Sequence, residues 1–89
     1  MADPKVPPHD ETAEQSVLGA ILIDKEAIIT VSETVRPEDF YSDINGLIYG
    51  AMMALYEERK PIDLLTLTER LKRDKQLKKI DTSYITDLI

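Results

Sequence analysis

The segment from Asp43 to Glu58 constrains the fold of this chain more than any other, because it has the pattern of a helix buried on two sides. One apolar stripe follows the 3.6-residue helical period and consists of Ile44, Leu47, Ile48, Ala51, Met52 and Leu55. A second apolar face consists of Tyr49, Met53 and Tyr56. Since more than half of the circumference is apolar, we predict a central helix, Asp43–Glu58, that other helices enclose.

Small residues mark a third line along this segment, where Gly46, Gly50 and Ala54 stand four residues apart. That spacing places them on one side of a helix, and their size leaves room beside it. A Gly-x-x-x-Gly pattern identifies helix pairs only in membrane spans. We therefore interpret it as close packing of a neighbouring helix inside a soluble bundle.

Two helices are predicted before the central one. Apolar spacing predicts the first over Glu11–Ile23, with Asp10 or Thr12 as its N-cap. Asp24 is the candidate N-cap of the second, Lys25–Val35. This second segment is rich in β-branched residues and would also suit a strand, but a strand between helices would have no pairing partner.

A short turn and two more helices are predicted around these. The Pro37–Asp39 segment should form a single turn that brings Phe40 and Tyr41 into the core. A fourth helix should run from its cap Asp63 through Asp74. A fifth should begin near residues 81–83 and present one apolar face made of Tyr84, Ile85, Leu88 and Ile89. The predicted fold class is all-α, a small bundle of about five helices around Asp43–Glu58.

The chain length and composition set the limits of this bundle. Its 89 residues allow one domain, and 43% hydrophobic with 31% charged residues is typical of a folded protein. Pro4, Pro7 and Pro8 predict an extended N-terminal arm over residues 1–10, which leaves residues 11–89 for the globular part. The chain has no cysteine and no apolar run long enough for a membrane span, so we predict a cytoplasmic protein.

Charge is distributed unevenly along the chain. The net charge of −6 disfavours general attraction to DNA or to anionic lipid. One stretch is basic instead, with a single acidic residue, Asp74, among Arg70, Lys72, Arg73, Lys75, Lys78 and Lys79. Such a run is usually a solvated helix end that complements the helix dipole, but Arg73 and Lys75 are candidate contacts for phosphate or for an acidic partner.

The sequence predicts no catalytic, cofactor or metal site. The three glycines do not open a phosphate-binding loop, and the single histidine, His9, has no second histidine with which to share a metal. A serine nucleophile would need a histidine base, which only the arm could supply. Tyr49 and Tyr56 are candidate protein-interface residues, because tyrosine can lie half-buried, although core-edge positions are more common for it.

Several short motifs together resemble the start of bacterial replicative DNA helicases of the DnaB type. They are Val6-Pro7-Pro8-His9, Ala13-Glu14-Gln15-Ser16-Val17-Leu18-Gly19-Ala20, Ile23-Asp24, Pro37-Glu38-Asp39-Phe40-Tyr41 and Pro61-Ile62-Asp63. Their order and spacing extend the likeness over about the whole chain. The chain departs from the family at Asn45 and Thr12, and Ile80 to Tyr84 replaces a glycine pair before a tyrosine.

The resemblance implies that this chain is the globular head of a helicase N-terminal domain. Helicases of this family are ring hexamers that unwind DNA with ATP, and their N-terminal domains form a collar that helps subunits associate and helps dock primase and the helicase loader. It implies no direct DNA contact, with ATP and Mg²⁺ bound by the motor domain of the parent protein. Because the chain ends on Ile89 within a predicted helix, we expect a fragment that stops before the helical hairpin and the motor domain.

Two other classes of protein stay open on the sequence alone. One is an unrelated helical adaptor, such as the helicase-binding domain of a primase. The other is a small DNA-binding helical module that uses the basic stretch from Arg70 to Lys79. The acidic total charge makes the DNA-binding class the weaker of the two.

Overall fold

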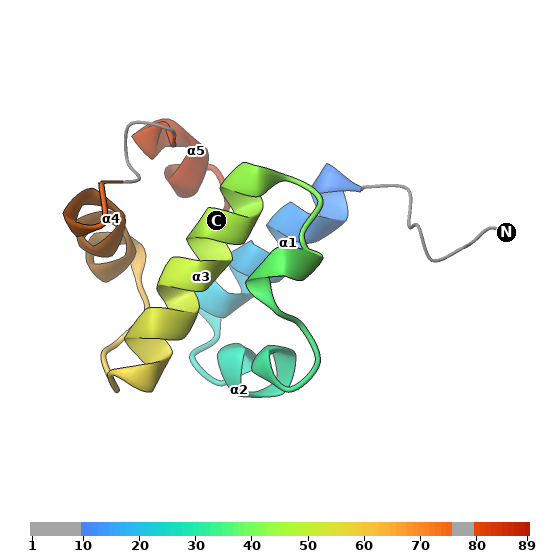
Figure 1. Cartoon of the computed structure of the whole chain (residues 1–89), viewed down its shortest axis with the longest axis horizontal. Coiled ribbons are helices and arrows are strands. Elements are labelled where there is room, and N and C mark those ends of the chain that lie inside the picture. Colours follow the sequence, from blue (N-terminus) through green and yellow to red (C-terminus); the bar gives the residue numbers. More distant parts are fainter. Residues whose placement is uncertain (1–9, 76–79) are drawn as a thin grey trace, which may run out of the picture.

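The computed structural model describes residues 10–75 and 80–89, and all regular structure in these ranges is helical. The elements are α1 (Glu11–Ile23), α2 (Ala27–Ser32), the 3-10 helix η1 (Pro37–Asp39), α3 (Asp43–Glu57), α4 (Leu64–Arg73) and α5 (Thr82–Thr86). Helix α3 crosses the middle of the molecule, with α4 on one side and η1 on the other (Figure 1). The all-α prediction is therefore confirmed. Of the predicted arm, only Asp10 belongs to the described residues.

The core forms around α3 as its apolar stripe predicts. Ile48 and Met52 have no exposed surface, and Leu55 is almost fully buried. The side chains packed around this stripe come from α1, α2, α4, α5 and the segment before α5, namely Leu18, Ile21, Ile28, Leu67, Leu71, Ile80 and Ile85. Every α-helix thus buries at least one residue in this core. Leu77, which the sequence also places in the core, lies outside the described residues.

The ends of α3 are set by local hydrogen bonds. The hydroxyl of Ser42 accepts a hydrogen bond from Asn45 N at 3.3 Å, so Ser42 is the N-cap and the helix begins at Asp43. At the other end, Lys60 N donates to Leu55 O at 2.9 Å, and Arg59 adopts a left-handed conformation with φ of 61°. This reverse turn closes the helix one residue earlier than predicted.

Helices α1 and α4 match their predictions closely because each has a strong cap. Asp10 accepts a hydrogen bond from Ala13 N at 3.1 Å, which identifies Asp10, and not Thr12, as the N-cap of α1. Asp63 Oδ1 accepts from Thr66 N at 2.9 Å, while Thr66 Oγ1 accepts from Asp63 N at 3.0 Å. This reciprocal capping box fixes the start of α4.

Two predicted helices are too long. Helix α2 begins at Ala27 and ends at Ser32, because Asp24 forms a turn with Glu26 N at 3.0 Å and has no role as the N-cap. Helix α5 spans only Thr82–Thr86, capped by Asp81. Its predicted apolar face is correct for Ile85, which is fully buried, but wrong for Ile89, whose side chain is 63% exposed.

The turn before α3 differs from its prediction. Phe40 packs against the core, whereas Tyr41 is 64% exposed, so only one of the two aromatic residues is brought inward. Residue 40 has extended backbone, in which successive side chains point to opposite sides. The predicted close approach at Gly46 is present, but its partner is η1: a Cβ there would lie 2.9 Å from Pro37 O.

Candidate protein-interaction surface

Two neighbouring hollows share Phe40 in their lining, one between α1 and η1 and the other between η1 and the first turns of α3. We call the two hollows together the Phe40 groove. The larger hollow has a volume of about 580 Å³ and is lined by Pro37, Glu38, Phe40, Ser42, Asp43, Gly46 and Leu47. The smaller has a volume of about 240 Å³ and is lined by Ala13, Glu14, Val17, Val35, Asp39 and Phe40. Together they offer an apolar floor between acidic residues.

Buried contacts beneath the groove hold its floor in place. The Phe40 and Tyr49 rings pack with their centroids 5.1 Å apart. The Tyr49 hydroxyl donates a hydrogen bond of 2.8 Å to Val35 O, which ties α3 to the segment before η1. Burial raises the pKa of Tyr49, and the nearby Asp39 carboxylate raises it further, so this phenol stays protonated as a donor.

A polar network joins three separate parts of the chain at the start of α3. Asn45 has no exposed surface, and its Nδ2 donates to Glu14 Oε1 at 2.9 Å. Its Oδ1 accepts from the Tyr84 hydroxyl at 2.5 Å, and that hydroxyl accepts from Gln15 Nε2 at 3.0 Å. Glu14 also accepts from Tyr41 N at 2.7 Å. The network fastens α1 and α5 to α3, because a buried polar side chain is costly unless it is hydrogen-bonded.

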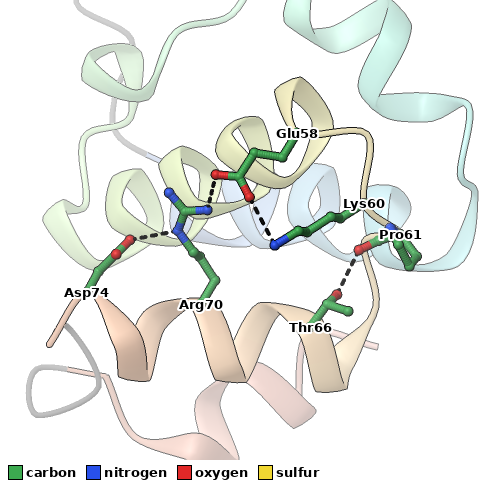
Figure 2. A network of polar contacts seen from close by, with 6 residues as sticks. All are labelled: Glu58, Lys60, Pro61, Thr66, Arg70 and Asp74. Atoms are coloured by element: carbon green, nitrogen blue, oxygen red, sulfur yellow. Dashed lines mark hydrogen bonds and ion pairs between the residues drawn. The ribbon is translucent and has the colours of Figure 1, made fainter.

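A second network ties the end of α3 to α4 (Figure 2). Arg70 donates to Glu58 Oε2 at 2.6 Å and to Asp74 Oδ2 at 3.0 Å, and Lys60 lies 3.3 Å from Glu58 Oε1. Hydrogen bonds from Arg70 and Lys60 lower the pKa of Glu58, and hydrogen bonds to Glu58 and Asp74 raise the pKa of Arg70. Arg70 therefore points into its own domain, and its charge is matched before any partner arrives.

The four candidate interface residues from the sequence do not form one site. Tyr49 is fully buried, so it is removed from the interface candidates: its hydroxyl has a backbone acceptor inside the fold. Tyr56 is 38% exposed near the end of α3. Arg73 lines a hollow of about 150 Å³ with Lys60 and Arg70. Lys75 lies in the turn after α4, with a left-handed φ of 63°.

The Phe40 groove itself was not predicted from the sequence. A signal was available, because the acidic residues Glu38 and Asp39 directly precede the aromatic pair Phe40 and Tyr41. Within residues 10–75 and 80–89, no group of three or more acidic, histidine or cysteine side chains could hold a metal ion. No helix in the same ranges is long and apolar enough to cross a membrane.

Comparisons with known proteins agree on one family. The profile of the DnaB-like helicase N terminal domain matches residues 6–89. The chain is 39% identical over 85 residues to the replicative DNA helicase DnaB of Geobacillus stearothermophilus and 42% identical over 85 residues to that of Rhodothermus marinus. These alignments cover 94% of this chain but only 19% and 9% of the two helicases.

A solved structure supports the same assignment. The N-terminal domain of DnaB helicase from Mycobacterium tuberculosis matches with a TM-score of 0.88 and 42% identity. That match covers 93% of this chain and 58% of the solved chain. The motifs of the family resemblance that lie within the described residues thus belong to a fold of the same kind. This chain belongs to the family of DnaB-like helicase N-terminal domains.

Proposed function

We propose that this chain is a protein-docking and oligomerisation module of a replicative DNA helicase, with no catalytic activity of its own. The observation that carries the proposal is the family match over residues 6–89. In this proposal the module acts in DNA replication in the bacterial cytoplasm, where it helps helicase subunits associate and contacts primase and the helicase loader. ATP, Mg²⁺ and DNA are bound by other parts of the parent helicase.

The surface chemistry supports docking of protein over binding of DNA. The net charge of −6 repels phosphate, and the most enclosed basic residue of α4, Arg70, is already paired with Glu58 and Asp74. Tyr41, an aromatic residue that is 64% exposed, directly follows Phe40, which lines two hollows of the surface. Aromatic residues next to apolar pockets are typical of protein interfaces.

Calorimetric titration of the 89-residue chain tests the proposal. We expect no heat of binding with ATP and Mg²⁺ or with single-stranded DNA at physiological salt, and saturable binding with primase or with the loader. A truncated primase without its helicase-binding region serves as the control partner. Tight binding of ATP or of single-stranded DNA, with no response to either protein, would contradict the proposal.

Substitutions in the basic segment separate docking from the DNA-binding alternative. Arg73→Glu and Lys75→Glu should leave the affinity for single-stranded DNA unchanged and very weak. If these residues contact phosphate, each reversal should lower the affinity and reduce the salt dependence by about one phosphate contact. The adaptor alternative is disfavoured because the relatives that the chain matches are helicases.

A further inference from the structure

The larger hollow of the Phe40 groove has room for one bulky apolar side chain. Pro37, Phe40 and Leu47 line it, and its volume is about 580 Å³. Asp43, Gly46 and Leu47 lie on one face of α3, because residues three and four apart are helical neighbours. Because Gly46 has no side chain, Pro37 of η1 can pack directly against this face of α3.

The rim of the groove is acidic. Glu38 and Asp43 line the larger hollow, and Asp39 lines the smaller one. No lysine or arginine occurs from Pro37 to Glu58, nor anywhere from Asp10 to Asp24, the two segments that supply most of the lining. Arg36 precedes η1 and is the nearest cation along the chain. The groove therefore presents negative potential around an apolar floor.

The groove is held open before any partner arrives. Its floor rests on the Phe40–Tyr49 ring contact and on the hydrogen bond from the Tyr49 hydroxyl to Val35 O. The Glu14 carboxylate accepts a hydrogen bond from Tyr41 N and fixes the edge of the groove. A site ordered in this way loses little conformational entropy on binding, which favours affinity.

We propose that the Phe40 groove binds a basic amphipathic segment of a partner protein, with a leucine or aromatic side chain in the larger hollow and lysine or arginine against Glu38, Asp39 and Asp43. This rests on the proposed docking function and names the chemistry of one partner. Charge complementarity selects the occupant, since apolar contacts give affinity and opposite charges give orientation and rate. A second copy of this chain is disfavoured as the occupant of this groove because its net charge of −6 opposes the acidic rim; the argument applies to the groove and not to the other surfaces through which subunits associate.

Titration of the isotope-labelled 89-residue chain with designed peptides tests the proposal by NMR. The probe is a helical peptide with one leucine flanked by lysines; one control peptide has glutamate for each lysine, and another has serine for the leucine. We expect amide shifts concentrated in η1 and in the first turns of α3. Both control peptides should bind at least roughly tenfold more weakly, as expected for loss of charge pairing or of the apolar anchor.

Matched variants localise the binding. Glu38→Lys and Leu47→Ala should each weaken the lysine peptide about three- to tenfold, and Glu38→Lys should also reduce the salt dependence. Glu57→Lys, at the far end of α3, and Leu65→Ala, which is 67% exposed on α4, are the controls and should change the affinity less than about twofold. Circular dichroism verifies that each variant folds. If Leu47→Ala does not fold, Glu38→Lys alone still tests the proposal.

Three results would overturn the inference. They are equal binding of the glutamate peptide, shifts confined to α4 and α5, and peptide-free shifts in the groove that change with protein dilution, which would identify a second copy as the occupant. Each of these leaves the proposed docking function standing if primase or the loader still binds the chain. If neither protein binds while the lysine peptide occupies the groove, the proposed function fails and the groove chemistry stands.

Discussion

Replacement of Asn45 by alanine tests whether the buried polar network holds α1 and α5 against α3. Asn45→Ala removes the hydrogen bond from Nδ2 to Glu14 Oε1 and the one from the Tyr84 hydroxyl to Oδ1. A hydrogen bond to a charged group contributes about 1.5–3 kcal/mol, and a neutral one about 0.5–1.5 kcal/mol. The expected loss in the free energy of unfolding is therefore about 2–4.5 kcal/mol.

That loss is large for a chain of this size. At roughly 0.05–0.15 kcal/mol per residue, 89 residues have a total stability of about 4–13 kcal/mol. Urea unfolding followed by circular dichroism measures the change, with the slope of the transition as a check on two-state behaviour. The companion variant Tyr84→Phe should cost about 1–3 kcal/mol, because Asn45 Oδ1 then loses a donor in a buried site.

The double variant decides whether the two residues act together. If they are coupled through the hydrogen bond, the combined loss should fall short of the sum of the single losses by about 0.5–3 kcal/mol. A loss below about 1 kcal/mol for Asn45→Ala, or additivity of the two changes within about 0.3 kcal/mol, would refute the reasoning. In that case the burial of Asn45 would be a matter of packing and would not join α5 to α3.

Three further experiments, with five substitutions between them, have outcomes set by local geometry. Gly46→Ala should destabilise the fold by about 1–3 kcal/mol, because the new Cβ would lie 2.9 Å from Pro37 O. Gly50→Ala should stabilise it by about 0.5–1 kcal/mol, since the new Cβ would make only ordinary contacts at 3.9 Å. Thermal unfolding of the two variants measures both changes, and a loss of stability in both would contradict this reasoning. Asp10→Ala should cost about 0.5–2 kcal/mol as a lost N-cap and Thr12→Ala almost nothing, and equal losses in urea unfolding would reassign the cap. Because the pKa of Glu58 is lowered, its carboxylate stabilises the fold fully at neutral pH, and this stabilisation is lost as the pH falls through that pKa. Glu58→Gln should therefore make stability depend less on pH in the acidic range, as measured by acid unfolding. An unchanged pH dependence would count against the pairing with Arg70.

Local signals were enough to predict the long helices. The bounds of α1 are those predicted, and the capping residue of α4 is the predicted Asp63. In both helices an apolar period and a capping side chain lie within a few residues of one another, so neighbours in sequence carry the information. Helix α2 was predicted too long because the apolar pattern continues to Val35, beyond the end of the helix. There, Thr34 N donates to Val31 O and not to Thr30 O, the acceptor in a regular α-helix.

Tertiary partners explain what the sequence did not predict. Tyr49 was a candidate for the surface because its hydroxyl needs a polar partner, but that partner is Val35 O, inside the fold. Asn45 was noted only as a departure from a family pattern, yet it is the one buried polar residue among those described, because Glu14 and Tyr84 converge on it from distant segments. Such pairings depend on how helices pack, which helical period alone does not determine.

The structure also changes the interpretation of the basic stretch that begins at Arg70. Read as sequence, Arg70 to Lys75 looks like a cationic patch, but Arg70 is held by Glu58 and Asp74 and contributes no free charge to a partner. By contrast, Glu38 and Asp43 border a hollow to which no lysine or arginine contributes. The acidic rim is thus a charged feature of the surface that the sequence alone did not single out, and because charge complementarity directs encounter, the partner that this face attracts carries positive charge.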